Sequence, residues 1–106
     1  ALVLPGVLRF NAVDAWAAKK YAELFPFLFP NEEIGNNNQT NASLFIENLS
    51  TLSKDLGLPQ KLRDVSIPED ACESMAKDAM KQTRLLVNNP REVTEKDAYD
   101  IYRSIW

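Results

Sequence analysis

The chain has 106 residues, a length that supports one hydrophobic core and excludes a two-domain enzyme within these residues. Hydrophobic residues make up 45% of the chain and charged residues 25%, a composition that is typical of a folded domain and excludes disorder. The 12 basic and 15 acidic side chains leave a net charge of -3, and because the basic residues are scattered, we expect no nucleic-acid partner.

The chain contains no histidine and a single cysteine. The absence of histidine excludes His-based acid–base catalysis, Ser-His and Cys-His nucleophile pairs and the commonest neutral metal ligand. The lone thiol, Cys72, cannot form an internal disulfide, which fits a reducing compartment, so we expect a cytoplasmic protein. No apolar run reaches the roughly 18 to 20 residues that cross a bilayer, so we expect no membrane partner.

The chain begins with an apolar segment that lacks the polar cap of a helix start. We interpret this start as the continuation of a longer chain, which would cover Leu2, Leu4, Val7, Leu8 and Phe10. Pro5 and Gly6 either lie in the first turn of a helix or kink it.

A second helix is predicted from Asp14, a candidate N-cap, to Phe25, because Pro26 disfavours continuation. Its apolar side carries Ala17, Tyr21, Leu24, Phe25 and Leu28. For the following run of phenylalanines and prolines, we favour a connector that fills its own core over a lid or a contact with a neighbouring domain.

Residues 31–41 are strongly polar and are predicted to form a surface loop. A third helix is predicted from Ala42 to Leu56, capped by Thr40 or Asn41 and ended by a left-handed Gly57. Its apolar side carries Ala42, Phe45, Ile46, Leu49, Leu52 and Leu56.

The last third of the chain predicts a turn at residues 62–65, a helix from Pro68 to Met80, a break at 87–91 and a final helix after Thr94. Cys72 shares a helical face with Ala76 and Met80, which favours a buried, inert thiol. Thr94 and Asp97 form a capping-box pattern, and the final helix has an apolar face of Ala98, Ile101, Tyr102 and Ile105. The chain is therefore predicted to be all-α, a bundle of about four to five helices.

The residues able to take part in chemistry are carboxylates, lysines, tyrosines and one thiol. The carboxylates at 32–33, 69–73 and 95–97 are better explained by loop solvation and helix N-termini than by acid–base pairs. Glycines occur only at positions 6, 35 and 57. The chain therefore contains neither the glycine-rich motif of a dinucleotide-binding site nor a Walker loop. We therefore expect no catalytic, cofactor-binding or metal-binding residue in this chain.

Four motifs occur in an informative order: Leu-Pro-x-Val-x-Arg-Phe-Asn from Leu4 to Asn11, Lys-Tyr-Ala-Glu at 20–23, Leu-Gly-Leu-Pro at 56–59, and Asn-Pro-Arg-x-x-Thr from Asn89 to Thr94. In this order they resemble the C-terminal part of the iron-containing (group III) alcohol dehydrogenases, over the whole chain. One departure is Gly6, where the family commonly has histidine.

The resemblance implies that residues 1–106 are the last part of a dehydroquinate synthase-like helical domain, without the dinucleotide-binding domain that precedes it. The family holds Fe²⁺ or Zn²⁺ with one Asp and three His, all upstream of residue 1, and uses NAD(P) for hydride transfer. By the same resemblance, residues 84–87 approach the substrate cleft, and Leu85 and Leu86 line it; ordinary core leucines are the alternative.

We therefore predict a C-terminal part of an alcohol or aldehyde oxidoreductase that is inactive alone. Its expected partners are the missing N-terminal part of the same enzyme and, through the unpaired first segment, further copies of itself. The alternative is a stand-alone helical interaction module that docks a partner helix on Phe25, Phe27 and Phe29. A carboxylate-only hydrolase has little support.

Overall fold

The computed structural model describes all residues from 1 to 106 and contains helices and no strand. The all-α prediction is confirmed. Five helices are longer than one turn, in agreement with the predicted number, and a single-turn helix was not predicted. The elements are α1 (Leu4–Asn11), α2 (Ala15–Leu28), α3 (Asn38–Asp55), the 3₁₀ turn η1 (Leu62–Val65), α4 (Ala71–Ala79), the short α5 (Thr83–Leu86) and α6 (Glu95–Ser104).

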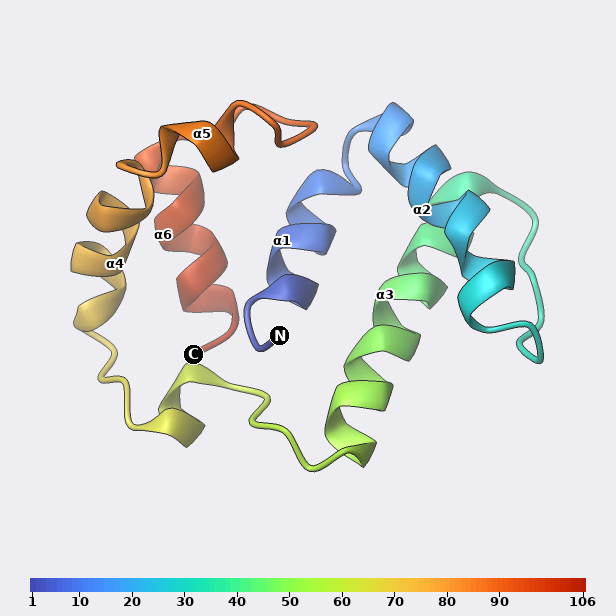
Figure 1. Ribbon diagram of the computed structural model, residues 1–106, viewed down its shortest axis with the longest axis horizontal. Coiled ribbons are helices and arrows are strands. Elements are labelled where there is room, and N and C mark those ends of the chain that lie inside the picture. The colour runs from blue at the N-terminus through green and yellow to red at the C-terminus, as the bar shows by residue number, and fades with distance from the viewer.

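The helices form a flat layer with α1 in its centre (Figure 1). Helix α2 packs on α3 along one flank, α4 packs on α6 along the other, and α1 contacts both α3 and α6. The molecule measures 40 × 31 × 19 Å. Because the thinnest dimension is less than two helix diameters of about 10–12 Å, the chain forms essentially one layer of helices.

The start of α1 settles the alternatives for Pro5 and Gly6, because both lie in the first helical turn. Gly6 is buried against α6: a Cβ atom at this position would lie 3.0 Å from Ile105 Cγ2 and 3.3 Å from Ile101 Cγ2. The departure from the family pattern at residue 6 therefore accompanies a close approach of α1 to α6.

An aromatic cluster joins α2 to α3. Phe25, Phe45 and Ile46 are buried there, and the Phe29 ring lies 6.4 Å from that of Phe45 in an edge-on arrangement. The prediction that α2 ends at Phe25 was wrong. The helix continues through Pro26 to Leu28, and the Phe29 N–H donates to the Phe25 carbonyl at 2.9 Å. We attribute this to aromatic packing, which offsets the loss of one hydrogen bond at the proline.

The aromatic cluster bears on the two interpretations of the phenylalanine run. Phe25 is 1% exposed and Phe29 is half-buried, so these two rings fill the chain's own core, as favoured. Phe27 is 83% exposed and does not, so the alternative of a contact with a neighbouring domain stays open for this ring, and the three rings do not form one docking patch.

The N-terminus of α3 lies four residues earlier than predicted. Asn37 caps the helix through its side-chain oxygen, which accepts from the Thr40 N–H at 2.8 Å, so neither Thr40 nor Asn41 is the cap. Asn41 is buried and instead binds Gly35, whose N–H donates to Asn41 Oδ1 at 2.7 Å. The polar loop is correspondingly shorter than residues 31–41. Gly57 ends the helix with φ +75, as predicted.

The flank of α4 and α6 is built around Leu62, Cys72 and Ile105. The prediction of a buried thiol is confirmed, since Cys72 is 0% exposed. Thr94 and Asp97 form the predicted capping box. Hydrogen bonds from the Thr94 backbone and hydroxyl to the Asp97 carboxylate lower the pKa of Asp97 below its ordinary value.

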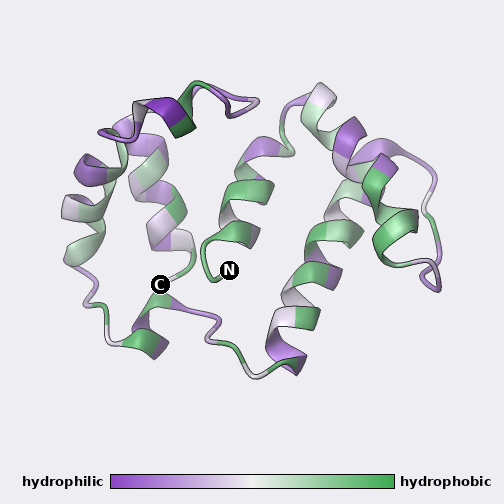
Figure 2. Cartoon of the chain, in the orientation of Figure 1, coloured by the Kyte–Doolittle hydropathy of each residue, from purple (hydrophilic) through white to green (hydrophobic).

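Several predicted core positions are exposed. Leu24 and Leu28 on α2, and Leu52 and Leu56 at the end of α3, are 47–68% exposed although they belong to the predicted apolar stripes. Figure 2 shows hydrophobic residues on the last turn of α2 and along α3, and mainly hydrophilic residues in the loop between them. A single layer of helices buries one side of each helix and leaves the other uncovered. None of the helices combines the length and hydrophobicity of a membrane span.

A reciprocal pair of amides joins the C-terminal end of α1 to the loop before α6. Asn11 Nδ2 donates to Asn89 Oδ1 at 2.9 Å, and Asn89 Nδ2 donates to Asn11 Oδ1 at 2.8 Å. Asn89 Nδ2 also donates to the Arg91 carbonyl at 2.7 Å. Asn11 is only 3% exposed, so its amide depends on this partner for most of its hydrogen bonding.

Arg91 strengthens the same junction. Its guanidinium donates to the Phe10 carbonyl, one of the last carbonyls of α1, and its Cζ lies 3.8 Å from the centroid of the Phe10 ring. The contact combines a helix C-terminal hydrogen bond with a cation–π interaction. Arg91 thus satisfies a carbonyl that the end of α1 leaves free. We call the set Phe10, Asn11, Asn89 and Arg91 the amide junction.

The unequal burial of the phenylalanines gives a matched pair of substitutions. We expect Phe25→Ala to lower the free energy of unfolding by about 3–5 kcal/mol, because it leaves a cavity in the aromatic cluster. Phe27→Ala is the control and should change it by no more than about 0.5 kcal/mol. Urea denaturation followed by circular dichroism measures both. Equal losses would contradict the assigned burial of the two rings.

The amide junction makes a second prediction. Asn89→Leu should cost about 1–3 kcal/mol, because it leaves the buried Asn11 amide without its main partner. The double variant Asn11→Leu/Asn89→Leu should lose less unfolding free energy than the two single variants lose together, since no buried amide is left without a partner. Asn36→Leu, at an exposed residue, is the control. Strictly additive losses in denaturant titrations would show that the two amides do not depend on one another.

Candidate functional site

A largely apolar cavity lies between α1, α5 and α6. It has a volume of about 330 Å³, and ten of its eleven lining residues are hydrophobic. Val7 and Phe10 of α1, and Val3 directly before this helix, contribute to its lining. The other lining residues are Ala79, Leu85, Leu86, Asn89, Val93, Ala98, Ile101 and Tyr102. We call this cavity the apolar pocket.

The structure brings both sequence-predicted cleft residues to the apolar pocket. Leu85 and Leu86 are the last two residues of α5 and both belong to the lining. Leu85 is 62% exposed and Leu86 is half-buried. Leu85 is thus the more accessible of the two to a molecule that approaches from solvent.

Sequence analysis did not identify the other lining residues as part of a site. The residues from α1 and α6 were recognised only as apolar helix faces, because periodicity marks burial without identifying the helix that packs opposite. The short α5 was missed since four residues are too few to show a period. The signal that could have located the pocket is the Asn-Pro-Arg motif, because Asn89 belongs both to the lining and to the amide junction.

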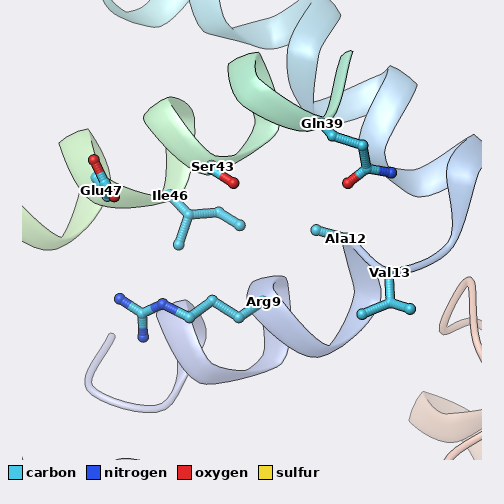
Figure 3. Close-up of a pocket in the computed structure, with 7 residues that line it drawn as sticks. All are labelled: Arg9, Ala12, Val13, Gln39, Ser43, Ile46 and Glu47. Carbon is cyan, nitrogen blue, oxygen red and sulfur yellow. The ribbon is translucent and has the colours of Figure 1, made fainter. Parts of the chain in front are cut away.

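A second, more polar groove lies between α1 and α3 (Figure 3). Its volume is about 280 Å³, and residues of α1 and its following turn face residues of α3: Arg9, Ala12 and Val13 on one side, and Gln39, Ser43, Ile46 and Glu47 on the other. Arg9 and Glu47 form no ion pair across it. No hydrogen bond joins the Ser43 hydroxyl to the Glu47 carboxylate or to another base, so the groove holds no activated nucleophile.

Several acidic residues of the chain are engaged in surface ion pairs and helix caps. Glu69 pairs with Arg103, and Glu73 lies 3.0 Å from the ammonium of Lys77. No three histidines, cysteines or carboxylates come together in a group that could hold a metal ion. The residues present therefore do not fit the metal that the family resemblance implies, and none of them is assigned to it.

Comparisons with known proteins agree on one family. The model of the C-terminal region of the Fe-containing alcohol dehydrogenase family matches residues 1–106. The chain is 34% identical to 1,3-propanediol dehydrogenase of Citrobacter freundii, over 97% of this chain and 26% of that protein. It is 32% identical to long-chain-alcohol dehydrogenase 1 of Geobacillus thermodenitrificans, over 98% of this chain and 26% of that protein.

A solved structure gives the same result. The crystal structure of a 1,3-propanediol oxidoreductase matches 99% of this chain and 26% of its own length, with a TM-score of 0.87 and 30% identity. The chain thus spans about a quarter of the length of the relatives that it matches. The resemblance carried by the four motifs is confirmed: the chain belongs to the iron-containing alcohol dehydrogenase family and corresponds to the C-terminal part of its members.

Proposed function

We propose that this chain is the C-terminal helical part of an iron-dependent, NAD(P)-linked oxidoreductase of alcohols and aldehydes, and that it forms one wall of the substrate cleft. The observation that carries the proposal is the match of the family model to all residues from 1 to 106. The position of Leu85 and Leu86 on the apolar pocket supports the role as a wall. The relatives are named for 1,3-propanediol, long-chain alcohols and lactaldehyde, so the family alone leaves the substrate open.

In this proposal the chain supplies shape and apolar surface. It has no histidine and no cluster of metal-ligating side chains, so the iron or zinc ligands and the nicotinamide site belong to the part of the enzyme that precedes residue 1. Leu85 and Leu86 would exclude water from the reacting end of the substrate. We also propose a cytoplasmic location, with which the free, buried Cys72 is compatible.

The test compares the chain with the longer protein that carries it. With Fe²⁺ and NAD⁺ or NADP⁺, the longer protein should oxidise primary alcohols, and the 106-residue chain should show no turnover and no stoichiometric, high-affinity iron binding. Loss of turnover on chelation would support metal dependence. Turnover or tight iron binding by the chain alone would contradict the proposed division of labour, and a longer protein inactive toward alcohols and aldehydes would refute the function.

We propose that the preceding part of the enzyme covers exposed apolar side chains of the helical layer, and that further copies of the chain cover them in its absence. Trp16, Phe27 and Val87 are 62–83% exposed, which favours association. We expect light scattering to detect dimers or larger species of the isolated chain, and fewer of them after Phe27→Glu. The matched control is Lys19→Glu, on the polar side of α2. A compact monomer at all concentrations would contradict self-association.

A further inference from the structure

The amide junction supports an inference about the position of α5. We infer that Asn89 is a positioning residue: through its reciprocal bonds to Asn11 it fixes α5, and with it Leu85 and Leu86, relative to α1. The consequence of this position for turnover rests on the proposed function, in which the two leucines belong to a wall of the substrate cleft.

Helix α5 is not held by packing. None of its residues is buried, and it is not among the helices that pack extensively on one another, which are α2 on α3, α4 on α6, and α1 on both α3 and α6. Leu85 and Leu86 border a cavity of about 330 Å³, and side chains that border a cavity lack dispersion contacts on that side. Apolar contacts therefore contribute little to where α5 lies.

Hydrogen bonds do not join α5 to its surroundings either. All hydrogen bonds of residues 83–88 lie within residues 82–89, including that of the Asn88 amide, which donates to the Arg84 carbonyl at 2.9 Å. Arg84 forms no ion pair. The segment is therefore a small unit with internal bonds, attached to the rest of the molecule at its two ends.

The two ends are held in different ways. At the first end, the Gln82 N–H donates to the Ala79 carbonyl at 3.1 Å, which joins the segment to the end of α4 through the backbone. At the other end, Asn89 exchanges two side-chain bonds with Asn11, of 2.9 and 2.8 Å. A unit attached only at its first end can swing about that end, whereas two reciprocal bonds at the other end fix both its distance and its orientation. Asn89 therefore decides where α5 lies over the space between α1 and α6.

Arg91 is the second attachment of the amide junction. Its guanidinium donates to the Phe10 carbonyl, but Arg91 lies two residues farther from α5 than Asn89. The Asn89 side chain also donates to the Arg91 carbonyl at 2.7 Å, so it fixes the turn between the two attachments. Loss of the Asn89 amide therefore frees α5 even where Arg91 stays bound.

The position of α5 can be measured in the longer protein, loaded with diamagnetic Zn²⁺. Spin labels are placed on Arg84→Cys in α5 and Glu47→Cys in α3, both at exposed residues, while Cys72 is buried and takes no label. Double electron–electron resonance should give a narrow distance distribution with the junction intact and a broadened or shifted one in Asn89→Leu. The matched control is Asn88→Leu, which changes the same residue type one position earlier and removes only a bond within the segment. It should leave the distribution unchanged.

The double variant Asn11→Leu/Asn89→Leu separates positioning from stability. It leaves no buried amide without a partner, so it should recover most of the unfolding free energy that Asn89→Leu loses. It does not restore the directional bonds, so the distance distribution should stay broad. In the longer enzyme, its KM for primary alcohols should stay about tenfold above that of the unaltered enzyme, with kcat changed by less than about threefold.

The outcomes separate this inference from the proposed function. A narrow, unshifted distribution in both Asn89 variants would overturn the inference and show that the preceding part of the enzyme holds α5. A double variant that regains the unaltered distance and KM together with its stability would overturn it too, because the role would then be structural only. A broad distribution with an unchanged KM would confirm the positioning of α5 and refute its role as a wall of the cleft. Absence of turnover on every alcohol and aldehyde by the unaltered longer protein would refute the proposed function, while the distances would still decide the inference.

Discussion

The reciprocal bonding of Asn11 and Asn89 fixes how the two ends of the chain meet. Each amide uses an N–H and an oxygen toward the other, so the pair tolerates little displacement before a buried polar group loses its partner. Arg91 adds a bond to the end of α1 and covers the Phe10 ring. Because Asn89 follows α5 by three residues, this junction also holds Leu85 and Leu86 over the space between α1 and α6.

The same junction explains why two short motifs identified the family although neither supplies chemistry. Phe10 and Asn11 end the first motif, and Asn89 and Arg91 begin the last one, 78 residues apart for the amide pair. The motifs are thus two halves of one structural contact. These motifs contain no catalytic acid, base or metal ligand, because the side chains of the amide junction bond to each other and to the end of a helix.

Local signals could be read correctly from the sequence where they act within a few residues. The Asp14 and Thr94 caps and the left-handed Gly57 each depend on their own turn. The error at Pro26 concerns a distant partner, because this residue stays helical where the Phe45 ring of α3 packs on α2. The error at the start of α3 is local: the Asn37 side chain accepts from the Thr40 N–H, and the Asn41 side chain binds Gly35. The apolar pocket was beyond sequence analysis because it needs the relative placement of three helices.

The apolar stripes show how far periodicity can predict burial. Leu24 and Leu52 lie on the expected faces but remain 47% exposed, because a layer only 19 Å thick has too few helices to cover both of its sides.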